Sequence, residues 1–180
     1  LVLTDELGRP QESDRLSLFD PGHNRIVGRP VVQWAGDRWV VLWQEAQGGF
    51  LTGAHLHLTT KFPHEAALDQ GINSLWSDLV TEFSQDQPGE LDMVWTGQRL
   101  GILLKHDGGT AGKRIYFKEI DREGNALGPT LWINAGSTGA YSPSVTYMEK
   151  ESDHYYLFAW LEHLSSMHAV QTATYGCTDE

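Results

Sequence analysis

Residues 143–162, PSVTYMEKESDHYYLFAWLE, hold the sequence pattern that decides the expected fold. One apolar run ends at Tyr147, a polar turn follows, and a second apolar run ends at Trp160. Looser copies of this pattern lie at residues 30–45, PVVQWAGDRWVVLWQE, and at residues 91–106, LDMVWTGQRLGILLKH. Two short apolar runs around a polar turn predict a β-hairpin, so the chain is expected to repeat one hairpin along its length.

A third apolar run follows each expected hairpin, at residues 54–58, 114–120 and 167–173. These runs alternate in polarity, and the second and third contain β-branched or aromatic residues, which is typical of strands. Each repeat therefore contributes at least three consecutive strands. Because short links join them, they are expected to pair in an antiparallel sheet.

A stretch that contains Asp and ends in glycine precedes each hairpin by a nearly constant distance. The glycines are Gly8, Gly71 and Gly124, and this residue type favours turns that need a positive φ. A mixed segment follows each turn, such as residues 74–83, SLWSDLVTEF. Apolar residues spaced four apart in this segment also fit a short helix, but its register with the other copies favours a strand.

The expected fold is all-β, with β-propeller-like four-stranded antiparallel repeats in a single domain of residues 1–180. About three blades' worth of sequence is present, whereas closed propellers have roughly four to eight blades. The chain would then belong to a larger propeller, form a ring with a second copy, or build an open assembly. The expected units are residues 1–29 (partial), 30–83, 88–134 and 143–175 (partial).

The repeat resembles the blades of bacterial β-propeller proteins, with the form P-x-(V/I)-x-W, then V-V-W-x-(D/E), then (L/I)-D-x-x-G. The middle copy departs from this form, because residues 104–106, LKH, stand where the others have Trp-x-Glu. The resemblance implies a propeller fold and a secreted or cell-envelope location, and it transfers no catalytic residue. The residues that carry it are Pro30, Val32, Trp34, Val41, Trp43, Glu45, Val94, Trp95, Leu104, Pro143, Val145, Tyr147, Trp160 and Glu162, with the turns at Asp5, Asp69 and Asp121.

Composition excludes several classes of partner. The formal net charge is 13 − 24 = −11, which argues against nucleic acid, because phosphate binding needs concentrated Lys and Arg. No run approaches the roughly 20 apolar residues of a membrane helix. The single cysteine, Cys177, allows no internal disulfide, although it could pair between chains or stay a free thiol. We expect no cofactor.

His55 and His57 are the candidate metal ligands. Residues i and i+2 of a strand share a face, so both imidazoles could bind one metal ion. Two ligands are few for such a site, and solvent-facing or hydrogen-bonded histidines are the alternative.

Two other segments are candidate ligand or partner contacts. His163 and His168 flank a short loop between expected strands, where they could converge or simply be exposed. Residues 59–66, TTKFPHEA, form an insertion relative to the other copies, and extra length in one repeat often carries specificity. Its candidate contact residues are Lys61, Phe62, His64 and Glu65.

Glu45 and Glu162 occupy matching positions two residues after a tryptophan, and a carboxylate pair suggests glycoside hydrolysis. His106 replaces them in the middle copy, so we favour a structural role for both. The predicted function is a non-catalytic binding or assembly module for a protein or glycan ligand, with self-association or association with further blades. One alternative is a lectin with aromatic pockets between blades. Another is a glycoside hydrolase or sialidase-like enzyme, in which two or three carboxylates and an arginine would converge.

Overall fold

The computed structural model describes residues 24–36, 39–47, 50–61, 89–107, 112–121, 124–134, 139–150, 153–164 and 166–178. Within these ranges the chain forms three β-sheets with antiparallel strand pairs and contains no helix. The all-β prediction is confirmed. These residues close neither a barrel nor a ring of blades, so the propeller itself stays a prediction.

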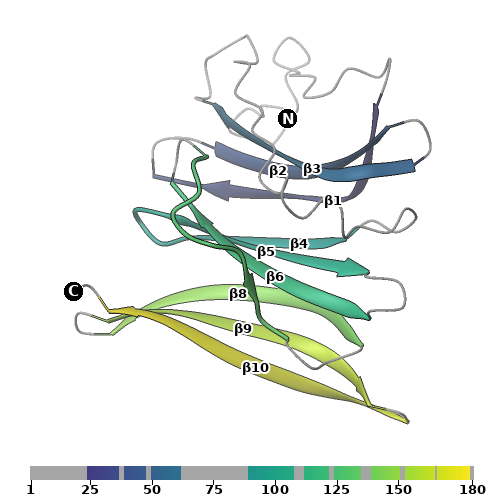
Figure 1. The fold of residues 1–180 in the computed structure, drawn as a ribbon. Coiled ribbons are helices and arrows are strands. Elements are labelled where there is room, and N and C mark those ends of the chain that lie inside the picture. Colours follow the sequence, from purple (N-terminus) through teal and green to yellow (C-terminus); the bar gives the residue numbers. More distant parts are fainter. Residues whose placement is uncertain are drawn as a thin grey trace, which may run out of the picture.

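Each sheet contains one expected hairpin and the strand after it (Figure 1). The first sheet contains β1 (Asn24–Trp34), β2 (Trp39–Gln47) and β3 (Phe50–Lys61). The second contains β4 (Glu90–Trp95), β5 (Leu100–Asp107), β6 (Lys113–Ile120) and the two-residue β7 (Leu131–Trp132). The third contains β8 (Ala140–Lys150), β9 (Asp153–Leu164) and β10 (Met167–Thr178).

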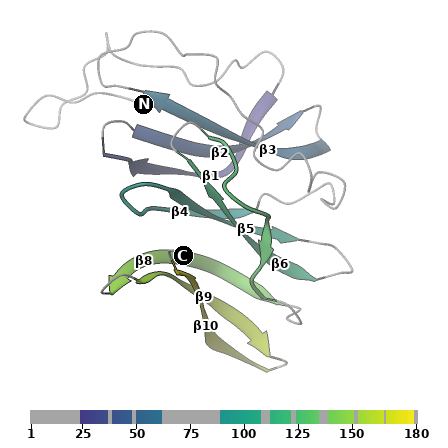
Figure 2. The same cartoon turned by 60° about the vertical axis from the view of Figure 1, so that its left-hand side comes forward.

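The sheets stack as layers, and the second sheet lies between the other two (Figures 1 and 2). Strand β5 explains this order, because its apolar residues point alternately to opposite faces. Ile102 and Leu104 belong to the core shared with the first sheet, whereas Leu103 belongs to the core shared with the third. A strand buried on both faces needs a nearly continuous apolar run, which is what residues 100–104 provide.

Aromatic rings dominate the core between the second and third sheets. Phe117 of β6 packs against Tyr156 and Phe158 of β9, with ring centroids 4.7 and 4.9 Å apart. All three side chains are buried. Contacts between aromatic rings in such tilted geometries add to the free energy of burial, so these rings fix the spacing of the two sheets.

Prolines mark irregularities in the first and third sheets. Pro30 and Pro143 lie within register shifts of the β1–β2 and β8–β9 pairs, where a missing N–H is tolerated. Beside the shift in β8, the Val145 N–H and the Ser144 hydroxyl both donate to Asp92 Oδ2 at 2.8 Å. Asp92 lies in β4, so these hydrogen bonds join the second sheet to the third.

The Asp-to-Gly turn predicted near residue 124 is confirmed. Gly124 has φ 89°, and its N–H donates to the carbonyl of Asp121 at 3.1 Å. The Asp121 carboxylate accepts hydrogen bonds from both nitrogens of Asn125. The turn leads the chain toward β7, which pairs with β6 and completes the only four-stranded sheet among the described residues.

Residues 1–23 and 62–88 lie outside the described residues. Most of the expected partial unit 1–29 and all of segment 74–83 fall there. The described part of the chain contains no helix that is long and apolar enough to cross a membrane. Three candidate contact residues, Phe62, His64 and Glu65, also lie outside the described ranges.

Candidate functional site

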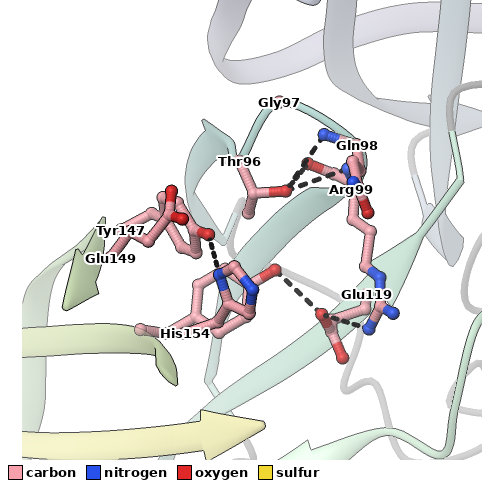
Figure 3. Close-up of a pocket in the computed structure, with 9 residues that line it drawn as sticks. Thr96, Gly97, Gln98, Arg99, Glu119, Tyr147, Glu149 and His154 are labelled. Atoms are coloured by element: carbon pink, nitrogen blue, oxygen red, sulfur yellow. Dashed lines mark hydrogen bonds and ion pairs between the residues drawn. The ribbon is translucent and has the colours of Figure 1, made fainter. Parts of the chain in front are cut away.

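A pocket of about 270 Å³ lies where the turn between β4 and β5 meets strands β8 and β9 (Figure 3). It therefore occupies one edge of the interface between the second and third sheets. Its lining combines one guanidinium, two carboxylates, one imidazole and two phenols. The lining residues are Thr96, Gly97, Gln98, Arg99, Glu119, Tyr147, Glu149, His154 and Tyr156.

Thr96 shapes the turn that presents Arg99. Its hydroxyl oxygen accepts hydrogen bonds from the N–H of Gln98 at 3.3 Å and of Arg99 at 2.9 Å. Its own N–H donates to the Arg99 carbonyl at 2.9 Å. Gly97 has φ 99°, a conformation that glycine adopts without strain. These contacts hold the Arg99 backbone, while 41% of its side chain stays exposed.

Glu119 connects the two walls of the pocket. The Tyr156 hydroxyl donates to Glu119 Oε1 at 2.8 Å, and Arg99 Nη1 lies 3.7 Å from the same oxygen. The Glu119 side chain is only 11% exposed, and a carboxylate in such a position needs charged and hydrogen-bonding partners. Because Glu119 lies in β6 and Tyr156 in β9, the hydrogen bond crosses between the sheets.

His154 and Tyr147 form the other side of the pocket. The Tyr147 hydroxyl and His154 Nδ1 share a hydrogen bond, and their rings stack with 14° between their planes and 5.9 Å between centroids. Glu149 of β8 lies opposite His154 in the strand register. Tyr147 also contacts Tyr156, with ring centroids 5.7 Å apart. This side of the pocket therefore packs against the aromatic core.

Comparisons with known proteins assign no family to this fold. No family model matches the chain, and a search of curated proteins finds no significant match. The ligand has therefore to be inferred from the chemistry of the lining residues.

For His163 and His168 the sequence left two alternatives open, convergence or simple exposure. They lie directly opposite each other in the β9–β10 pair, and their ring centroids are 5.0 Å apart. Both are exposed, and neither lines the pocket. Among the described residues, no group of three or more His, Cys, Asp or Glu could hold a metal ion. A contact role for this pair stays a prediction.

Three further predicted candidates, His55, His57 and Lys61, lie in the first sheet. His55 and His57 of β3 stand opposite Glu45 and Trp43 of β2, and Lys61 ends β3. Metal binding by the two histidines and a ligand contact at Lys61 therefore stay predictions.

Glu162 fits the structural role that the repeat comparison favoured. It is buried, and Trp160 Nε1 donates to its Oε2 at 3.1 Å. The tryptophan two residues earlier thus supplies the carboxylate with a hydrogen-bond donor.

The pocket residues were not among the sequence candidates. A signal was available in the turn W-x-G-x-R, which is repeated at residues 34–38 and 95–99 and places an arginine after the aromatic of the first two hairpins. Glu119 gave no comparable signal. Its meeting with Tyr156, 37 positions away in sequence, depends on how the second and third sheets stack.

Proposed function

We propose that this chain is a non-catalytic binding and assembly module whose ligand occupies the pocket between the second and third sheets. One observation carries the proposal. Glu119 is held by Tyr156 from the opposite sheet and by Arg99 from the turn, so the polar groups of the pocket are already in place. Groups that are ordered before binding lose little conformational entropy when the ligand arrives.

A glycoside hydrolase or sialidase-like enzyme is the second candidate, because two carboxylates and an arginine line one pocket. Hydrolysis of this kind requires one carboxylic acid that an apolar environment keeps protonated. Glu149 is exposed, and Glu119 faces a guanidinium, so neither has that environment. We therefore favour binding without hydrolysis. Hydrolysis of a glycoside panel that is lost in Glu119→Gln would support the enzyme instead.

The assembly part of the proposal concerns the outer faces of the stack. In the repeat, Val32 and Trp34 occupy the positions of Met93 and Trp95, which pack between the first and second sheets. In the first sheet this face has no described sheet beyond it, and Val32 and Trp34 are 48% and 39% exposed. On the outer face of the third sheet, Val170 is 70% exposed.

These outer faces support self-association as a proposal. Within the chain, each sheet packs its face on the next, so a second copy could continue the stack by placing its first sheet on the third sheet of the first copy. Such a head-to-tail contact either closes into a ring or continues as a filament. A secreted or cell-envelope location, implied by the propeller resemblance, remains part of the proposal.

Thermal unfolding in the presence of ligand classes tests the binding function. The panel contains neutral sugars, sugar acids, sugar phosphates and small amines. A ligand at 100 times its Kd stabilises the folded state by about 2.7 kcal/mol, which raises the Tm of a domain of this size by roughly 5 °C or more. We expect at least one class to do so.

Arg99→Ala is the test variant, and Arg29→Ala is its matched control, since Arg29 is exposed and lies outside the pocket. The ligand shift should disappear in Arg99→Ala and persist in Arg29→Ala. A shift that survives in Arg99→Ala, or a panel in which no class raises the Tm, would contradict a binding function at this pocket.

A further inference from the structure

We infer that the pocket binds a saccharide residue that carries no negative charge. This inference rests on the proposed binding function and specifies its ligand. Three charged side chains line the pocket and determine which ligand charge it tolerates: Arg99, Glu119 and Glu149. The guanidinium of Arg99 lies 3.7 Å from the carboxylate of Glu119. The carboxylate of Glu149 therefore has no opposite charge among these three.

An anionic ligand fits this arrangement poorly. An anion would meet an arginine whose charge is already shared with Glu119 and would be repelled by Glu149. A neutral ligand avoids that repulsion, and a positively charged group would be attracted by Glu149. The charges of the pocket therefore exclude an anion.

The hydrogen-bonding groups further narrow the choice. Carboxylates only accept hydrogen bonds, and a guanidinium only donates them. In Figure 3, Arg99 and Glu119 lie on one side of the pocket, and Tyr147, Glu149 and His154 lie on the other. A ligand between them must offer donors and acceptors in several directions without a negative charge. A sugar does this, because each hydroxyl group both donates and accepts.

The pocket also supplies apolar surface. Tyr147 and Tyr156 line it with aromatic rings, and the C–H face of a sugar ring can pack against such rings while its hydroxyl groups reach the polar side chains. Its volume of about 270 Å³ is near the lower end for ligand pockets, roughly 300–1,000 Å³. A single sugar residue matches this size, with any further residues of a glycan left outside.

A matched chemical series tests the inference. Isothermal titration calorimetry is carried out on the full chain with the methyl glycosides of glucose, galactose and mannose, and then with the corresponding uronic acids and 2-amino sugars. All members of a series share a ring, so charge is the main variable. We expect a neutral glycoside to bind and its uronic acid to bind at least five-fold more weakly, the factor for one unit-charge repulsion at about 4 Å in water. The amino sugar should bind no more weakly than the neutral glycoside.

Glu149→Gln supplies a readout that a structural defect would not give. The substitution removes the uncompensated charge at an exposed position, so binding of the uronic acid should improve by about five-fold. Arg29→Ala should behave as wild type in every arm.

The outcomes separate this inference from the proposed function. Tighter binding of a uronic acid than of its neutral partner, or weaker binding of the amino sugar, would overturn this inference while leaving a binding module. Heat of binding only for a non-sugar class, with loss in Arg99→Ala, would do the same. If neither the sugar series nor the thermal panel binds, both proposals are wrong.

Discussion

Gly101 of β5 provides a direct test of how the second and third sheets pack. A Cβ atom at this position would lie 2.6 Å from Tyr156 Cε1 and 3.0 Å from Phe117 Cε2. Real Cβ atoms do not approach other atoms this closely, so one of the rings would have to move. Both rings are buried against each other and against Phe158, which leaves little room for such a shift.

The expected cost of Gly101→Ala follows from two opposing effects. Replacing glycine in a strand normally stabilises a protein by roughly 0.5–1 kcal/mol, because the unfolded chain loses freedom. Forcing a methyl group into a packed core costs about 1–3 kcal/mol. The steric effect is the larger one at a 2.6 Å approach, so we expect a net loss of about 1–2 kcal/mol in the free energy of unfolding.

Urea unfolding followed by tryptophan fluorescence measures this loss. With a slope of roughly 2 kcal/mol per molar urea, the midpoint should fall by about 0.5–1 M at unchanged slope. Gly128→Ala is the matched control, because no atom lies within 4 Å of its Cβ position and its φ is not positive. Its midpoint should stay the same or rise slightly.

The same substitution can be measured in the Tyr156→Val variant, which lacks the ring atoms nearest to the Gly101 Cβ position. Gly101→Ala should lower the free energy of unfolding less in that variant than in the wild type. A Gly101→Ala midpoint equal to or above that of wild type would refute the packing of Tyr156 and Phe117 over β5.

Asn134→Ala should lower the free energy of unfolding by about 2 kcal/mol in urea titrations. The buried amide oxygen of Asn134 accepts a hydrogen bond from the Ile115 N–H at 2.6 Å, and its removal leaves that donor unpaired. An unchanged urea midpoint would contradict this expectation. The Tyr155 hydroxyl donates to Asp153, and this hydrogen bond raises the pKa of Tyr155. In Asp153→Asn the phenolate absorbance of Tyr155 should therefore appear at lower pH. An unshifted titration curve would contradict this explanation of the raised pKa. If the head-to-tail contact closes a ring of two copies, light scattering should give a dimer near twice 20.1 kDa, and Val170→Lys should give a monomer. A monomeric wild type would exclude the head-to-tail contact.

Local patterns in the sequence were sufficient to predict the hairpins. The link from each apolar run to the next is short, so β1–β2, β4–β5 and β8–β9 pair with near neighbours in the chain. The third strand of each sheet also pairs with its near neighbour, as β2–β3, β5–β6 and β9–β10.

The middle copy also contains a buried charge with a local partner. Lys105, between the two positions that depart from Trp-x-Glu, lies on a buried face of β5. Its ammonium group lies 2.5 Å from Glu90 Oε1, and the two residues stand opposite each other in the β4–β5 register. A buried lysine without this partner would be costly.

The pocket could not be predicted in the same way, because it depends on contacts between sheets. Arg99 lies on a turn that the sequence repeats, but Glu119 and Tyr156 meet only when the second sheet stacks on the third. Stacking depends on which face of each strand is buried, and β5 is apolar on both faces. Its sequence therefore does not indicate which neighbour each residue contacts.

The location of ligand binding tests the central claim most directly. Amide ¹H–¹⁵N spectra of the full chain would be recorded during titration with the neutral methyl glycosides. Saturable shifts should concentrate at residues 96–99 and 147–156, on the two walls of the pocket, and should be absent in Arg99→Ala. Saturable shifts confined to other strands, or no saturable shifts at all, would contradict the claim that this pocket is a saccharide-binding site.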